Sequence, residues 1–319
     1  MPRDHGQSSF DRYEKTRDNL ASKASISTSE RWTSPHTHPG HSVWRVAIVK
    51  LRVLAMFVIR RLSQGGGRRH ALQELKKLTG SAGGKTVLVV GSGPSAEKLN
   101  LAEVAARQRT GELVVIATNH YLASPLAKTV IPDFLVWSDD GFHPRLRITN
   151  AERWELVSQH PSVRLVMPWT WQKDLPDTGV TNQVAYFDDD SLETWSKNIS
   201  PLKPRGYQGT TGAKALALAV HLAPTATQVI GLDLSYIKNI AVNADNSITR
   251  HPTHMSGTDS GQQDLTGYTL LGMADLLYST ANHFRALHTH FSGHEIYTLD
   301  PHSLVDAFPK VSDSPLINP

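Results

Sequence analysis

A glycine-rich turn after a run of β-branched residues is the first stretch of this chain that could do chemistry. Val87 to Val90, after Thr86, predict a short buried strand, and the turn Gly91-Ser92-Gly93-Pro94-Ser95 follows it directly. Proline suits the first position of a helix, and glycines let a backbone approach a ligand closely. Free N–H groups at the start of a helix bind phosphate. The turn therefore predicts a phosphate site, although a tight turn without a ligand would have the same sequence.

Polar residues also follow other predicted strands. Asn119, Ser138 with Asp139 and Asp140, and Asp233 all come soon after apolar runs. Ligands of open parallel sheets bind beyond the carboxyl ends of the strands, so we expect these side chains near the glycine-rich turn. Their amide, hydroxyl and carboxylate groups could form hydrogen bonds with a donor substrate that carries a nucleotide. Each alone could be a turn residue or a helix cap, and it is their number that predicts a site.

NAD is not expected, although Ala96 completes a G-x-G-x-x-A pattern. Sheets that bind NAD need an acidic side chain at the end of the second strand, where it contacts the ribose. In this chain the predicted second strand, residues 113–117, ends in Thr118-Asn119-His120 and has no carboxylate there.

Apolar strands alternate with helical segments from residue 85 onward. This alternation predicts a doubly wound α/β domain, Rossmann-like, with a mostly parallel sheet and right-handed crossovers. The expected helices span 96–107, 152–160 and 211–222, and the expected strands span 87–90, 113–117, 133–137, 163–167, 183–187 and 228–231.

Charge is unevenly distributed over the 319 residues. Residues 1–80 carry a net charge of +9 and the remainder −5, so the body of the protein is not expected to bind nucleic acid. The chain has no cysteine, which excludes disulfides and suits the reducing cytoplasm. We expect a disordered polar tail at 1–42, a basic amphipathic helical extension at 43–80, and a catalytic domain at 81–319.

The segment 43–62 leaves two interpretations open. Trp44, Ile48, Leu51, Val58 and Leu62 fall along one face of a predicted helix, and basic residues interrupt the apolar run. Such a helix is a poor transmembrane span but could lie on the inner face of a membrane as a peripheral contact. It could equally pack on the catalytic domain or on a second subunit.

Three segments, in their order along the chain, resemble the motility accessory factor and pterin diphosphokinase-like family, which is related in fold to the family-42 bacterial sialyltransferases. They are the turn 91–95, the stretch Ile131 to Asp139, and Gly231 to Tyr236. Thr210-Thr211-Gly212-Ala213 and Leu299 to Val305 are similar to sialyltransferase segments. Each motif is short, and the resemblance covers residues 85–309.

This resemblance implies a glycosyltransferase that moves a nonulosonic acid, such as sialic acid, from a CMP donor to a glycan or lipid-linked acceptor, with no cofactor required. By position, Gly93 and Ser95 would hold the donor phosphate, Asn119 the cytidine, and Thr211 with Gly212 the sugar carboxylate or the base. The predicted substrate-binding residues are Gly91, Ser92, Gly93, Ser95, Asn119, Ser138, Asp139, Thr211, Gly212 and Asp233.

A lid at about residues 237–267, polar and rich in glycine, would cover the donor. The general base of the sialyltransferases is a lid histidine, and the resemblance points to His254 here, with His251 second. An imidazole titrates near neutral pH and could take a proton from an acceptor hydroxyl. Tyr236 would contact the leaving phosphate.

The carboxylates leave other functions open. Where the sialyltransferases have an asparagine, this chain has Ser138-Asp139-Asp140. Asp139, Asp140 and Asp233 could instead hold Mg²⁺ for a diphosphokinase of the 6-hydroxymethylpterin type, which takes pyrophosphate from ATP. A chelator would stop that reaction and spare the sugar transfer. A catalytically inactive nucleotide-binding protein would bind the nucleotide without turnover.

Overall fold

The structure is a computed structural model that divides the chain into two compact units, Met1–Ile59 and Arg60–Pro319. In the first unit it describes five helical positions, which are Leu51, Leu54, Ala55, Val58 and Ile59. In the second it describes 61–62 and 66–318, apart from 147–149, 193–195, 208–209, 235–239, 243, 245–247, 251–254, 256–262 and 265–269.

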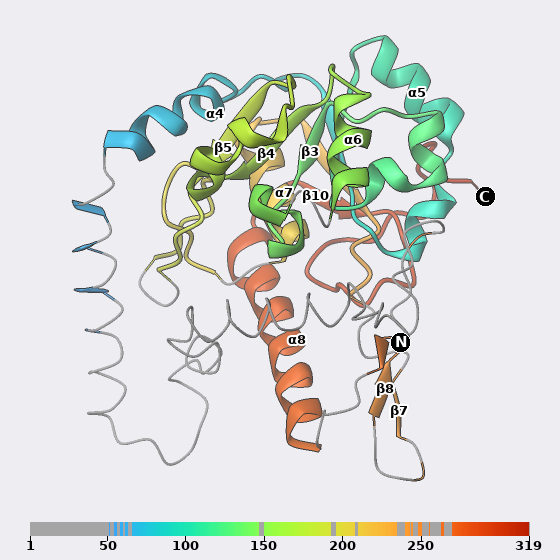
Figure 1. The fold of residues 1–319 in the computed structure, drawn as a ribbon. Helices are drawn as coiled ribbons and strands as arrows, with labels where there is room; N and C mark the ends of the chain where they lie inside the picture. Colours follow the sequence, from blue (N-terminus) through green and yellow to red (C-terminus); the bar gives the residue numbers. More distant parts are fainter. Residues whose placement is uncertain are drawn as a thin grey trace, which may run out of the picture. The chain divides into compact units, whose positions relative to one another are not determined.

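A seven-stranded sheet forms the centre of the second unit (Figure 1), in the order β10-β6-β1-β2-β3-β4-β5. Every strand pair in it is parallel. This confirms the predicted Rossmann-like α/β class. The strands are β1 (Thr86–Val90), β2 (Leu113–Thr118), β3 (Phe134–Val136), β4 (Arg164–Pro168), β5 (Val184–Phe187), β6 (Ala226–Ile230) and β10 (Ile296–Thr298).

Alternate residues of the strands feed two apolar cores, one on each face of the sheet. Leu88 and Val90 pack with α5 (Leu101–Arg109) and α6 (Ala151–Ser158). Val87 and Val89 pack with α7 (Thr211–His221) and the end of α8 (Leu270–Phe291). A strand covered on both faces needs apolar residues throughout, which explains why β1 lacks the polar alternation of a half-exposed strand.

Among the described residues, seven short 3₁₀ helices connect these elements. They are η1 (Pro94–Lys98), η2 (Tyr121–Ala123), η3 (Pro125–Lys128), η4 (Asp140–Phe142), η5 (Pro144–Leu146), η6 (Trp169–Asp174) and η7 (Pro176–Thr178).

The compact unit begins earlier in the sequence than the expected boundary at residue 81. Leu75 of α4 (Gln73–Lys77) is fully buried in the same core as α7. Arg61 and Arg68 both form ion pairs with the buried Asp188, which follows β5. The end of the basic extension therefore belongs to the folded domain.

The segment expected to form a lid contains a second, three-stranded antiparallel sheet, in the order β7-β8-β9. Its strands are β7 (Ile240–Val242), β8 (Ile248–Arg250) and β9 (Gln263–Asp264). Met255 is fully buried, and its N–H donates to Ser92 O at 3.0 Å. This bond joins the segment to the loop after β1. In the described part of the chain, no helix is long and apolar enough to cross a membrane.

Candidate functional site

The glycine-rich turn after β1 is packed against the loop after β6. Gly91 N–H donates to Ile230 O and Gly93 N–H to Gly231 O, both at 2.8 Å. A Cβ atom at Gly91 would lie 2.3 Å from Gly231 O, which is far inside van der Waals contact. Gly231 itself has φ 74°. The glycines are therefore needed because two backbones meet here.

The carboxylate of Asp233 lies where the sequence predicts a bound phosphate. Ser95 N–H donates to Asp233 Oδ2 at 3.0 Å, and Ser95 Oγ donates to Asp233 Oδ1. Ser95 Oγ also accepts from Gly231 N–H at 2.9 Å. A Cβ atom at Gly93 would lie 2.3 Å from Asp233 Oδ2. A side chain of the protein thus occupies the position of an anionic ligand.

The geometry therefore does not fit the predicted binding of phosphate by Gly91, Gly93 and Ser95. Their N–H groups are used within the protein, and Ala96 N–H donates to Gly93 O at 3.1 Å. The following helix, η1, has only five residues and is of the 3₁₀ type, so it gathers few aligned peptide dipoles. Ser92 differs, because its Oγ is buried with no hydrogen-bond partner among the described residues.

Asn119 follows β2 in a left-handed backbone conformation, with φ 50°. Its N–H donates to Val136 O at 3.2 Å, and its carbonyl accepts from Trp137 Nε1 at 2.9 Å. Asn119 Oδ1 is buried and has no partner among the described residues. A left-handed non-glycine residue is uncommon, and such conformations persist where the surroundings hold them. The backbone bonds thus fix an amide that lacks a partner for its oxygen.

Ser138 and Thr211 connect the end of β3 to the start of α7. Their hydroxyl oxygens are 2.8 Å apart and share a hydrogen bond. Thr210 caps the helix by accepting from Ala213 N–H at 3.3 Å. A Cβ atom at Gly212 would lie 2.2 Å from Leu232 Cδ2, so this small residue lets α7 approach the loop after β6. These bonds hold Thr211 at the carboxyl edge of the sheet.

The three carboxylates proposed for Mg²⁺ have different surroundings. Asp139 and Asp140 are exposed, and Asp139 caps η4 by accepting from Gly141 N–H at 2.9 Å. Asp233 is buried and bonded to Ser95. Within the described ranges, the acidic group whose ligand atoms lie within 4.8 Å of one another is Asp188, Asp189 and Asp190. The structure therefore does not group Asp139, Asp140 and Asp233 as metal ligands.

Arginines already neutralise the acidic group after β5. Arg61 Nη2 lies 2.6 Å from Asp188 Oδ2 and 3.0 Å from Asp190 Oδ2, and Arg68 also pairs with Asp188. Burial raises the pKa of Asp188, and the hydrogen bond and charge of Arg61 oppose that rise. Because guanidinium groups occupy the carboxylates, this cluster serves to fasten the extension to the sheet.

Lys214 lies near the predicted site residue Thr211 and was not among the residues predicted from the sequence. It lies one turn after Thr211 on α7, and its Nζ is 5.8 Å from the centroid of the Phe187 ring. Burial and the neighbouring Arg205 lower the pKa of Lys214 to about 7, against the opposing effect of nearby carboxylates. A lysine in the Ala- and Leu-rich stretch of α7 was the available signal, but its surroundings depend on residues far away in the sequence.

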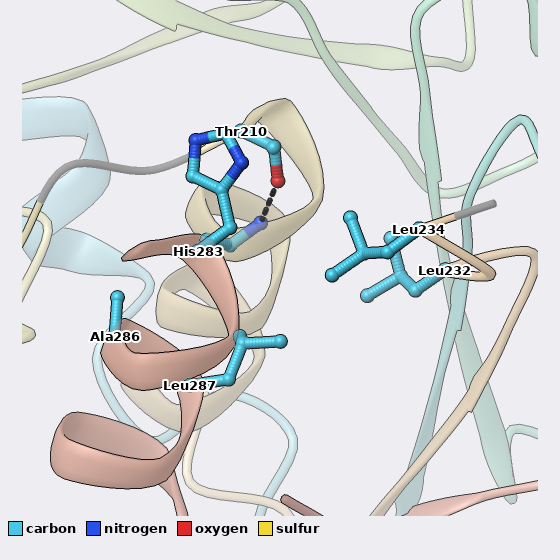
Figure 2. A pocket seen from close by; sticks show the side chains of 7 residues that line it. Thr210, Leu232, Leu234, His283, Ala286 and Leu287 are labelled. Atoms are coloured by element: carbon cyan, nitrogen blue, oxygen red, sulfur yellow. Dashed lines mark hydrogen bonds between the residues drawn. The ribbon is translucent and has the colours of Figure 1, made fainter. Parts of the chain in front are cut away.

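A small apolar pocket lies beside the start of α7 (Figure 2). Thr210, Leu232, Leu234, His283, Ala286 and Leu287 line it, with Ala213. His283 comes from α8, and its Nδ1 is buried without a partner among the described residues. Burial lowers the pKa of His283, so its imidazole is neutral at neutral pH. This histidine was not among the residues predicted from the sequence.

The three predicted catalytic residues, Tyr236, His251 and His254, lie outside the described residues. Their roles stay predictions. Met255, the residue after His254, is the described residue of this stretch, and it is bonded to the loop after β1.

Comparisons with known proteins give distant likenesses among solved structures only. No known family matches the chain, and no curated protein matches it. The structure of MAf glycosyltransferase from Magnetospirillum magneticum AMB-1 is similar, with 14% sequence identity and a TM-score of 0.42. The match covers 77% of this chain and 38% of that one, so the chain spans less than two fifths of that protein.

Proposed function

We propose that the protein is a glycosyltransferase that moves a nonulosonic acid from a CMP donor to an acceptor hydroxyl. The observation that carries the proposal is a pair of buried oxygens, Ser92 Oγ and Asn119 Oδ1, that lack partners among the described residues. They follow β1 and β2, which are adjacent and parallel with Val90 opposite Ala117. Buried polar atoms are normally paired, and ligands of this fold bind at this edge.

The roles of the described residues follow from their chemistry. The Asn119 amide would contact the cytosine edge, and the Ser138–Thr211 hydroxyl pair would contact the ribose or the sugar carboxylate. Ser92 would reach the donor through its free hydroxyl. The loop after β1 would have a structural role, because its N–H groups are hydrogen-bonded within the protein. The residues concerned are Gly91, Gly93 and Ser95, with Asp233 as the acceptor for Ser95.

Sugar transfer requires one bond to form and one to break. The acceptor oxygen attacks the anomeric carbon, the bond from that carbon to the phosphate oxygen of CMP breaks, and the acceptor proton passes to a base. We propose His254 as this base, with His251 as the second candidate, and Tyr236 as the donor of a hydrogen bond to the departing phosphate. The bond from Met255 to Ser92 supports a base in this segment, because it ties the neighbouring residue to the donor edge.

The acceptor is proposed to be a glycan or a lipid-linked sugar at the inner face of a membrane. In the first compact unit, Leu51, Val58 and Ile59 are helical and are 63%, 44% and 60% exposed. Apolar side chains on a basic helix favour adsorption to anionic lipid. Vesicle co-sedimentation of the full chain would test this contact.

The function is tested by nucleotide binding and turnover of the full chain. A thermal-shift series with CMP, CDP, ATP and NAD, each with and without Mg²⁺, should give its largest response with CMP alone, because a ligand of the folded state raises the melting temperature. Turnover of a CMP-nonulosonic acid should persist in chelator. His254→Ala should lower kcat at least 100-fold, whereas the exposed control His294→Ala should not.

Two results would overturn the proposal. Stabilisation by ATP only when Mg²⁺ is present would indicate the diphosphokinase. CMP binding with no transfer from any CMP-sugar donor, and with binding unchanged in His254→Ala, would indicate a nucleotide-binding protein without catalysis.

A further inference from the structure

Lys214 presents a cation with unusual surroundings at the carboxyl edge of the sheet. Its side chain is partly buried, and its Nζ makes neither a hydrogen bond nor an ion pair with any residue in the part of the chain that the structure describes. The nearest aromatic face, that of Phe187, offers only a weak attraction at 5.8 Å. A partly desolvated ammonium with no acceptor in the described part of the chain is suited to an incoming anion.

Charged groups from three connections act electrostatically on Lys214. Asp139 and Asp140 follow β3, Asp189 follows β5, and Arg205 lies in the loop before α7. Arg205 Nη1 donates to Asp189 O, but Arg205 Nε is buried with no partner in the described ranges. The two cations repel each other, which contributes to the lowered pKa of Lys214. A shared anion would relieve that repulsion and supply acceptors for both.

Lys214 is also joined to the proposed donor edge through its own helix. Thr211, three residues earlier, shares a face of α7 with Lys214 and bonds to Ser138. The Lys214 N–H donates to the carbonyl of Thr210 at 3.2 Å, within the capped first turn. The hydroxyl pair and the lysine are therefore held on one rigid element.

We infer that Lys214, with Arg205 beside it, binds the anionic group of the donor at the edge formed by β3, β5 and α7. This inference rests on the proposed function. The recognised chemistry is a compact oxyanion, either the CMP phosphate or the carboxylate of a nonulosonic acid. The N–H group of Ser95 in the glycine-rich turn already donates to Asp233. In this proposal the side chains of Lys214 and Arg205 therefore bind the anion in place of the backbone N–H groups of the turn.

Binding of an anion should draw a proton onto Lys214. The pKa of the free amine is about 7, so part of the population is neutral at pH 7.5, and an adjacent anion raises that pKa. Asp189, Asp140 and Asp139 act in the same direction as the anion, and Arg205 acts against it. Proton uptake therefore accompanies binding, and this signature separates an anion site from a merely structural lysine.

The first test compares CMP, cytidine and N-acetylneuraminic acid by calorimetry at pH 7.5, in buffers of different ionisation enthalpy. Wild-type protein should bind CMP at least tenfold more tightly than cytidine, with net proton uptake. Lys214→Met should lose both the preference and the uptake, whereas Lys214→Arg, which stays charged, should keep the preference and lose the uptake. A preference for N-acetylneuraminic acid that Lys214→Met abolishes would assign the site to the carboxylate. An unchanged CMP preference in Lys214→Met overturns the inference and leaves the proposed function standing.

The second test uses wild-type protein alone and does not need a nucleotide. Lysine labelling by amine acylation at pH 7.5 is followed by peptide mass spectrometry, with and without inorganic pyrophosphate. Pyrophosphate should slow the labelling of Lys214 at least fivefold and leave the labelling rate of the exposed Lys203 unchanged. If no nucleotide binds but this protection occurs, the proposed function fails and the anion site stands. Equal labelling with and without pyrophosphate overturns the anion site.

Discussion

The loop after β1 and the edge formed by β2, β3 and α7 lie at the same end of one sheet. The backbone N–H groups of the loop have partners within the protein, whereas two buried side-chain oxygens, Ser92 Oγ in the loop and Asn119 Oδ1 at the edge, have none among the described residues. The N–H groups concerned are those of Gly91, Gly93 and Ser95. The sequence of the loop looks more like a ligand site than that of the edge, and the geometry reverses this order.

The difference teaches that a glycine pattern reports close approach and leaves the approaching group undefined. A phosphate, a second backbone or a carboxylate side chain can each require a missing Cβ atom. Here the approaching groups are Gly231 O and Asp233 Oδ2. Buried polar atoms without a hydrogen-bond partner are better indicators of a ligand site, because their burial is unfavourable unless a ligand bonds to them.

The strongest way to break the comparison is to remove the carboxylate that closes the loop. Asp233→Ala leaves Ser95 N–H and Oγ buried without their acceptor, and we expect the free energy of unfolding to fall by about 3 kcal/mol. Urea denaturation measures the loss, and the exposed Asp313→Ala should change it by less than about 0.5 kcal/mol. A small loss in Asp233→Ala, together with weaker CMP binding, would instead mean that the loop is the ligand site.

A smaller effect on stability is expected from the charge of Lys214. The folded-state pKa of Lys214, about 7, is below that of an unfolded chain, so the unfolded chain binds more protons at alkaline pH. The free energy of unfolding of the wild type should therefore rise from pH 7 to pH 8.5, by up to about 2 kcal/mol. Lys214→Met should lack this rise in parallel urea titrations. An identical pH profile in the two proteins would show that the Lys214 amine is solvated.

The smallest effect on stability should come from Thr211→Val, which should also weaken the binding of CMP. The change keeps the shape of the side chain and removes its hydrogen bond to Ser138, so we expect a loss of about 1 kcal/mol. The affinity for CMP should fall about tenfold, which corresponds to about 1.4 kcal/mol. The exposed Thr110→Val serves as the matched control for both measurements. Unchanged CMP affinity in Thr211→Val would remove this edge from the site.

Much of the fold could be predicted because its signals are local. The predicted strand at 87–90 lies within β1, and those at 133–137 and 163–167 match β3 and β4 to within one residue at each end. The helix α8 was not assigned in advance, although it has 22 residues. Its sequence contains glycine, serine, threonine and histidines, which are modest helix formers, and its packing against the sheet through Leu287 and Phe291 supports it.

The candidate site could be predicted only in part. Asn119, Ser138 and Thr211 were identified because they follow strands or begin a helix, and both positions are visible in the sequence. Lys214 was missed because a lysine in a helix is ordinarily solvated, and its burial depends on Phe187 and Arg205. The glycine-rich loop was predicted as a phosphate site for the same reason, because no local pattern shows that the Asp233 carboxylate bonds to Ser95.

By itself, the sequence determined the class of the sheet, its two-sided burial and the end at which polar residues gather, since hydrophobic runs and strand order are properties of neighbouring residues. Only the tertiary structure decided which of those polar groups are already satisfied. Asp233 reaches Ser95 across 138 positions in the chain, and hydrogen bonds at that separation are set by how the strands stack, which no local pattern encodes.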